Sequence, residues 1–210
     1  MNLIITSIED SPFSYSEVVD LIHSSFEERL NQGLHFTCST ITTDQFKQTT
    51  EKGIVLVAWD SETSSLLGTS TVSIRKDTRG NLYGYHEYLA ISPKAKRLGV
   101  GTKLLESHTY NLINRCGQYV LSDTAVGADS SVKWHVKNGF RIIGLRSFPS
   151  TNYYSYIFRK QLTPSVLWDS KYFTSVRTFI SSVLVKSLYN EDGSYTLLGE
   201  MTLRVIKLKK

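Results

Sequence analysis

The sequence predicts a mixed α/β fold in which a mostly antiparallel central sheet carries helices on both faces. Three strand-like runs, at residues 54–59, 66–75 and 82–91, follow one another with short turns between them. Apolar residues at helical spacing precede these runs and also follow them. Strands joined by short turns pair as antiparallel neighbours, and amphipathic helices bury their apolar stripes against such a sheet.

The first half of the chain predicts two helices before the central strands. Residues 3–8 form a short apolar run typical of an edge strand, and residues 15–30 predict an amphipathic helix that ends before Gly33. Residues 43–50 predict a second helix, capped by Thr42 or Thr43. The turn Arg79-Gly80-Asn81 then leads into the strand at 82–91.

The second half alternates helices and strands and closes with a strand pair. We expect a helix from Thr102, a buried strand at 119–122, and a helix at 130–137 capped by Asp129 or Ser130. Residues 140–145 and 153–160 predict an antiparallel pair. The expected order is therefore β-α-α-β-β-β-α-β-α-β-β.

Length and composition favour one domain with an appendage. The chain has 210 residues, of which 40% are hydrophobic, so a sizeable core is expected. We expect the domain at residues 1–160 and the appendage at 161–210. No apolar run is long enough for a membrane span, and the N-terminus does not resemble a secretory signal. Cys38 and Cys116 are far apart without metal-ligand spacing, which predicts reduced thiols in the cytoplasm and no bound metal.

The charge is distributed unevenly along the chain. Residues 1–60 carry nine acidic and three basic side chains, whereas residues 61–160 carry six acidic and fourteen basic ones. A basic middle fits a polyanionic nucleotide ligand. It fits a nucleic acid as well, but no nucleic-acid-binding motif accompanies it, so we expect no nucleic-acid partner.

A basic glycine-containing loop lies between the strand at 82–91 and the following helix. Pro93 ends the strand, and Lys96 and Arg97 come just before Gly99 and Gly101. Glycines let a backbone approach a ligand closely, and a helix N-terminus offers unpaired N–H donors to a phosphate. The loop is either a phosphate site, which the two added cations favour, or an ordinary strand-to-helix turn. Its spacing matches neither the P-loop nor the dinucleotide-binding pattern.

Two ordered motifs resemble the GNAT superfamily of N-acyltransferases. Leu89-Ala90-Ile91-Ser92-Pro93 followed by Lys96-Arg97-Leu98-Gly99-Val100-Gly101 resembles the family's acyl-CoA loop, with Lys96 where Gln or Arg is usual. Trp134-His135-Val136-Lys137-Asn138-Gly139-Phe140 resembles a second family segment, with His135 where Tyr is usual. The resemblance covers about residues 1–160 and implies an acetyl-CoA-dependent N-acetyltransferase.

The resemblance also implies which residues contact acetyl-CoA. Ile91 would offer its backbone N–H to the thioester carbonyl. The expected contacts with the rest of acetyl-CoA are Lys96, Arg97, Leu98, Gly99, Val100, Gly101 and Thr102. No cysteine lies near either motif, which favours direct transfer within a ternary complex over an acyl-enzyme.

Amine acylation also needs a base and a group that protonates the departing thiolate. Strand periodicity places Tyr85, Glu87 and Leu89 on one face, and many members of the resembled family carry a Glu at the position of Glu87. Glu87 is either this base or a structural carboxylate. His86 faces the other way as scaffold, unless a bulge turns it. His135 is either the acid or a packed helix histidine.

The acceptor is left open by the sequence. The acidic first sixty residues suggest a cationic amine, and the aromatic run 148–154 suits stacking on a sugar or base, which favours an amino-sugar nucleotide or another small amine. His35 and Phe36 either touch this acceptor or close the sheet edge. A non-catalytic acyl-CoA-binding or regulatory module on the same fold is the alternative.

The last fifty residues lie outside the resemblance. Residues 176–188 predict an amphipathic helix and 195–208 predict one or two short strands. We expect the apolar stripe to pack on the same chain or on a second copy in a homodimer, and rank a membrane surface third.

Overall fold

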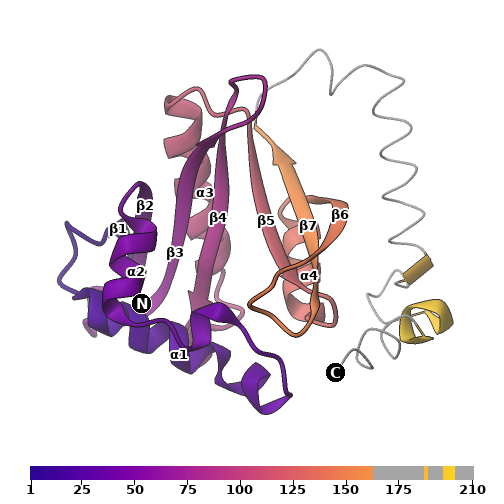
Figure 1. The fold of residues 1–210 in the computed structure, drawn as a ribbon. Helices are drawn as coiled ribbons and strands as arrows, with labels where there is room; N and C mark the ends of the chain where they lie inside the picture. Colours follow the sequence, from indigo (N-terminus) through magenta and orange to yellow (C-terminus); the bar gives the residue numbers. More distant parts are fainter. Residues whose placement is uncertain (163–186, 189–195, 202–210) are drawn as a thin grey trace. The chain divides into compact units, whose positions relative to one another are not determined.

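A computed structural model describes residues 1–162, 187–188 and 196–201 (Figure 1). Its elements follow the predicted order β-α-α-β-β-β-α-β-α-β-β, with two short 3₁₀ turns, η1 (Thr37–Ser39) and η2 (Pro93–Ala95). The mixed, mostly antiparallel α/β fold that the sequence predicts is confirmed. The chain divides into two compact units, Met1–Gly117 and Gln118–Lys210.

Unit 1 contains four antiparallel strands that are neighbours in chain order. They are β1 (Leu3–Ser7), β2 (Gly53–Asp60), β3 (Ser65–Lys76) and β4 (Leu82–Ile91). The β3–β4 hairpin closes at Asp77, whose carboxylate accepts hydrogen bonds from the backbone N–H groups of Arg79 and Asn81. The hairpin register pairs Ser73 with Tyr85 and Thr71 with Glu87.

Helices cover both faces of this sheet, as β2 illustrates. Val55 and Val57 belong to a core cluster with α1 (Tyr15–Asn31) and α2 (Thr43–Thr50). Leu56 and Ala58, which alternate with them, belong to a second cluster with α3 (Val100–Asn114). A strand buried on both faces has no polar side, which explains the continuous apolar run IVLVAW.

The helices of unit 1 begin in two different ways. Ser14 and Thr42 start α1 and α2 with capping boxes, in which Glu17 and Gln45 bond back to the cap. Helix α3 begins at Val100, two residues earlier than the sequence predicts, and has no side-chain cap.

Unit 2 contains β5 (Tyr119–Ala125), α4 (Asp129–Lys137), β6 (Arg141–Ser147) and β7 (Tyr154–Gln161). Strand β7 lies between β5 and β6 and is antiparallel to both. The predicted closing pair is therefore confirmed. The predicted cap of α4 is wrong, because Ala128 holds that position without a side-chain hydrogen bond and Asp129 is already helical.

Most of the predicted appendage lies outside the described residues. Of the helix expected at 176–188, the structure describes only residues 187–188, and these two are helical. The strands expected at 195–208 are wrong where they can be compared, since residues 197–201 are helical. The domain boundary at residue 160 and a homodimer contact stay predictions. None of the described helices combines the length and the apolar character that crossing a bilayer requires.

Candidate active site

The start of α3 is an uncapped helix N-terminus at the predicted glycine loop. Its N-cap is Gly99, whose φ of +81° is a left-handed conformation that suits glycine. Arg97 is also left-handed, with φ of +69°, at a cost for a residue that carries a Cβ. The first backbone bond of the helix runs from the Lys103 N–H to the Gly99 carbonyl, at 3.0 Å.

This geometry leaves donors available for an anion. Within the described residues, the N–H groups at the first three helical positions bond to no acceptor; they belong to Val100, Gly101 and Thr102. Lys96 and Arg97 stand just before them. A helix N-terminus with free donors, a positive dipole end and two cations can hold a phosphate, so the residues present fit the pyrophosphate of CoA.

Helix α1 lies against both the end of β4 and this loop. The Ser25 hydroxyl donates to the Ile91 carbonyl at 3.1 Å, and the Lys96 ammonium pairs with the Glu28 carboxylate at 3.3 Å. Ser25 and Glu28 are three residues apart and so share one helix face. The sequence alone did not indicate either contact.

Glu87, the predicted base, is held by two side chains of β3. The Ser73 hydroxyl donates to one carboxylate oxygen at 2.7 Å, and the Arg75 guanidinium bonds the other at 3.1 Å. The guanidinium also lies over the Tyr85 ring, 4.4 Å from its centroid. The Glu87 side chain is 29% exposed, so a ligand can still reach the carboxylate. The structure thus brings Tyr85 and Glu87 together and adds Ser73 and Arg75, which sequence reasoning missed.

A β-bulge interrupts β4 immediately after Glu87. The register to β3 shifts between Thr69 and Thr71, and Tyr88 has φ of +52°. The extra residue reverses the alternation, so Leu89 packs in the cluster with α3 while Ala90 packs with α1 and α2. The prediction that Leu89 shares a face with Tyr85 and Glu87 is therefore wrong.

Tyr88 itself packs beneath α2. Its ring meets Phe46 at 5.2 Å edge to face, and its hydroxyl lies 3.4 Å from that of Thr49. Burial raises the pKa of Tyr88, so the phenol stays protonated near neutral pH.

His86 points to the opposite face from Glu87. It is 3% exposed, and its ring lies 5.7 Å from that of His108 on α3. His108 is fully buried and contacts the Ser70 hydroxyl and carbonyl through Nε2. Burial lowers the pKa of His108 to about 4, so this ring is neutral at pH 7. The bulge begins after His86 and does not turn it toward Glu87.

In unit 2, His135 is a buried ring with both nitrogens engaged. It is 3% exposed, and Phe158 stacks on it at 4.3 Å. Nδ1 lies 2.7 Å from the Ser131 carbonyl and Nε2 lies 3.0 Å from the Ser122 hydroxyl. A carbonyl only accepts, so Nδ1 donates to Ser131, and Nε2 shares the other hydrogen bond with the Ser122 hydroxyl. This arrangement favours a packed histidine over a proton donor.

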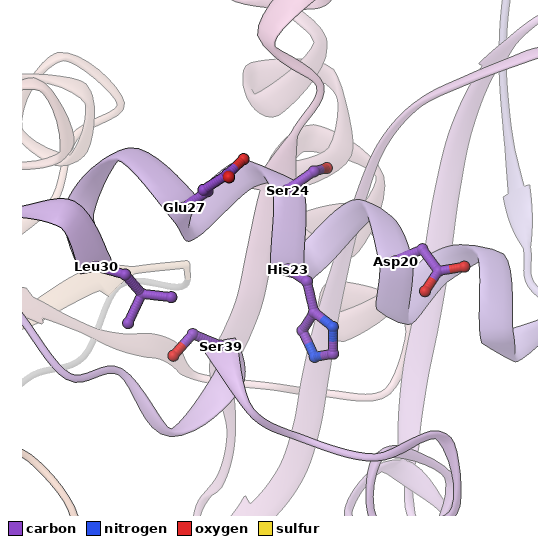
Figure 2. A pocket seen from close by; sticks show the side chains of 6 residues that line it. All are labelled: Asp20, His23, Ser24, Glu27, Leu30 and Ser39. Carbon is purple, nitrogen blue, oxygen red and sulfur yellow. The ribbon is translucent and has the colours of Figure 1, made fainter.

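A shallow groove of about 370 Å³ runs along the outer side of α1. Figure 2 shows the lining side chains: Asp20, His23, Ser24, Glu27 and Leu30 come from α1, and Ser39 comes from η1. His23 Nε2 contacts the Ile41 carbonyl at 3.0 Å. Two carboxylates attract cations, but an open acidic surface alone assigns no role.

Two other sequence predictions concern aromatic side chains and metal. Phe36 is buried against Phe26 at 5.1 Å, which favours a packing role, whereas His35 is exposed. In unit 2, the Arg146 guanidinium lies 5.0 Å from the Phe148 centroid, at the start of the aromatic run. Across the described residues, no cluster of three or more His, Cys, Asp or Glu side chains could hold a metal ion.

Comparison with known families identifies the class of protein. The model of the acetyltransferase (GNAT) family matches residues 15–140, which is more than half of the chain and includes both motifs. The chain therefore belongs to the GNAT family of acetyltransferases. A search of curated proteins found no match.

Solved structures show the same fold at low sequence identity. An acetyltransferase of the GNAT family from Streptococcus pneumoniae is 16% identical with a TM-score of 0.59, over 77% of this chain and 100% of that one. An N-acetyltransferase from Staphylococcus aureus Mu50 is 12% identical with a TM-score of 0.59, over 77% and 99%. The NatC complex bound to Gag peptide and CoA contains a chain that is 13% identical with a TM-score of 0.57, over 78% and 100%.

Proposed function

We propose that this protein transfers an acetyl group from acetyl-CoA to a primary amine, directly and within a ternary complex. The observation that carries the proposal is the uncapped N-terminus of α3, which the glycine loop joins to the bulged strand that holds Glu87. The first feature suits the CoA pyrophosphate and the second suits proton removal from the acceptor. A cytoplasmic location belongs to the same proposal.

Each residue has a physical task in this scheme. Lys96, Arg97 and the N–H groups of the α3 start bind the phosphates, while the Ile91 N–H polarises the thioester carbonyl. Glu87 takes a proton from the acceptor ammonium, because a protonated nitrogen has no lone pair for attack. Ser73 and Arg75 keep the Glu87 carboxylate in one orientation. A thiol has a usual pKa of about 8.5, so its thiolate departs with modest help and solvent can protonate it.

The acceptor is an amino-sugar nucleotide or another small amine in this proposal. A nine-to-three excess of acidic side chains in residues 1–60 supports a cationic amine. The NatC structure contains a peptide, so peptide amines belong in the same test.

A second candidate is a non-catalytic acyl-CoA-binding or regulatory module. The buried His135 favours it, because this ring stands where the family segment usually has tyrosine and both of its nitrogens are hydrogen-bonded within unit 2, away from a departing thiolate.

A thiol-release assay separates the two candidates. Acetyl-CoA is incubated with the protein and with amino-sugar nucleotides, polyamines or short peptides, and free CoA is measured. The proposal predicts amine-dependent release that Glu87→Gln lowers. Tight CoA binding without release for any amine class would support the non-catalytic module instead.

A further inference from the structure

Glu28 forms an ion pair with Lys96, and the phosphates of the proposed cosubstrate would need the same lysine. Lys96 belongs to the glycine loop, whereas Glu28 belongs to α1, and their charged atoms are 3.3 Å apart. The contact between these elements is not isolated, since Ser25, three residues before Glu28, donates to the Ile91 carbonyl. Helix α1 therefore presents a carboxylate to the loop at a defined place.

A phosphate and the Glu28 carboxylate compete for the same ammonium. A lysine carries one compact positive charge, and a second anion nearby either displaces the first or is repelled by it. The Lys96 and Glu28 side chains are 52% and 72% exposed, so water can solvate both charges as they separate. A phosphate can therefore replace Glu28 at Lys96 without burying an unpaired charge. The replacement still loses the interaction energy of the Lys96–Glu28 ion pair.

We propose that Glu28 is a further residue that sets the affinity for CoA, by holding Lys96 until a CoA phosphate takes it over. This inference rests on the proposed CoA site at the start of α3. In the free protein, the carboxylate stands in for a phosphate oxygen at Lys96. When CoA binds, Lys96 turns to the phosphate and Glu28 returns to solvent on α1.

The size of the effect follows from the exposure of the pair. Exposed ion pairs contribute little, so Glu28→Gln should tighten CoA binding by about two- to fivefold. Salt screens exposed charges, with a Debye length of about 10 Å at 0.1 M, so the gain should shrink as ionic strength rises.

Glu27→Gln is the matched control. Glu27 is the preceding residue of the same helix, loses the same charge, and pairs with no cation within the described residues. Both variants remove one negative charge from the same turn of α1, but only Glu28→Gln releases Lys96. The difference between them therefore isolates the ion pair from long-range electrostatics.

The experiment is calorimetry with CoA on the full chain, in a cycle with Lys96→Gln. We expect Glu28→Gln to bind CoA more tightly than Glu27→Gln, and this difference to disappear when both are made in the Lys96→Gln background. Equal affinities for the two glutamate variants, or a difference that persists without Lys96, would overturn the inference.

The same experiment distinguishes this failure from failure of the proposed function. If the unmodified protein binds CoA, and Gly101→Asp does not, the proposed site stands and the Glu28 comparison decides the inference alone. If the unmodified protein does not bind CoA, both are overturned together.

Discussion

His108 should make the protein sensitive to mild acid. Burial lowers its pKa to about 4 in the folded protein, whereas a histidine in an unfolded chain titrates near ~6.5. The unfolded chain therefore binds a proton as pH falls below about 6.5, and the folded protein does so only near 4. The stability that depends on a neutral His108 is present above this window and is lost as pH falls through it.

The magnitude follows from the two titrations. Over the whole window, about 2.5 pKa units correspond to a loss of roughly 3 kcal/mol in the free energy of unfolding. Between pH 7 and pH 5 the expected loss is about 2 kcal/mol, because folded His108 is still almost entirely neutral at pH 5. The environment of the ring supports this, since Ser70 and His86 are its polar neighbours and neither supplies a negative charge.

Urea unfolding followed by tryptophan fluorescence at pH 7, 6 and 5 tests this prediction against His108→Gln. The variant also loses packing, so the slopes with pH are compared rather than the absolute stabilities. His86 and the other histidines remain in both proteins, and the slope difference isolates His108. We expect the variant to lose about 2 kcal/mol less between pH 7 and pH 5. Parallel curves for the two proteins would refute the reasoning.

Three further predictions concern packing and catalysis. Gly84→Ala should lower the free energy of unfolding by about 1–3 kcal/mol in urea titration, because the Cβ of the new alanine would lie 2.5 Å from Leu112 Cδ1. An unchanged urea midpoint would contradict this. Glu87→Gln should retain CoA affinity but reduce turnover by about 10²–10⁴-fold in the thiol-release assay, and turnover near that of the unmodified protein would remove Glu87 as the base. His135→Phe should change turnover by less than about threefold. It should lower the melting temperature, because the variant loses two hydrogen bonds inside unit 2. A large rate loss in a stable variant would instead make His135 the acid.

The sequence predicted the elements well where local patterns are strong. The bounds of β4 agree at both ends, because turn residues precede Leu82 and Pro93 lies two residues after Ile91. The early start of α3 was missed, since the helix dihedrals begin directly after left-handed Gly99 rather than after Gly101. A glycine inside the first turn of a helix looks like a loop residue in sequence alone.

The arrangement around Glu87 was predicted only in part. Strand periodicity correctly placed Tyr85 with Glu87, but it failed at Leu89 because a bulge depends on pairing with β3 and leaves no local signal. The contacts of Ser73 and Arg75 could have been predicted from the hairpin register. Pairing residues on either side of the turn places Ser73 opposite Tyr85. The burial of His135 could not have been predicted in this way, because it depends on Phe158 and Ser122, which are distant from His135 in the sequence.

The contact between Glu28 and Lys96 joins residues that are 68 positions apart. Helical spacing showed which face of α1 is apolar, but Glu28 lies among exposed residues whose partners spacing does not predict. Contacts of this kind depend on how the helix packs on the sheet and appear only in three dimensions.

Calorimetry of CoA binding to Gly101→Asp tests the central claim most directly, that the start of α3 binds the pyrophosphate. Gly101 is the second residue of the helix and is buried, and an aspartate there puts a negative charge in the first turn, next to the proposed phosphate site. Asn114→Asp is the control, because it adds the same charge at the exposed other end of α3. With both variants folded by circular dichroism, we predict that Gly101→Asp loses CoA binding while Asn114→Asp keeps it. Unchanged CoA affinity in Gly101→Asp would contradict the account.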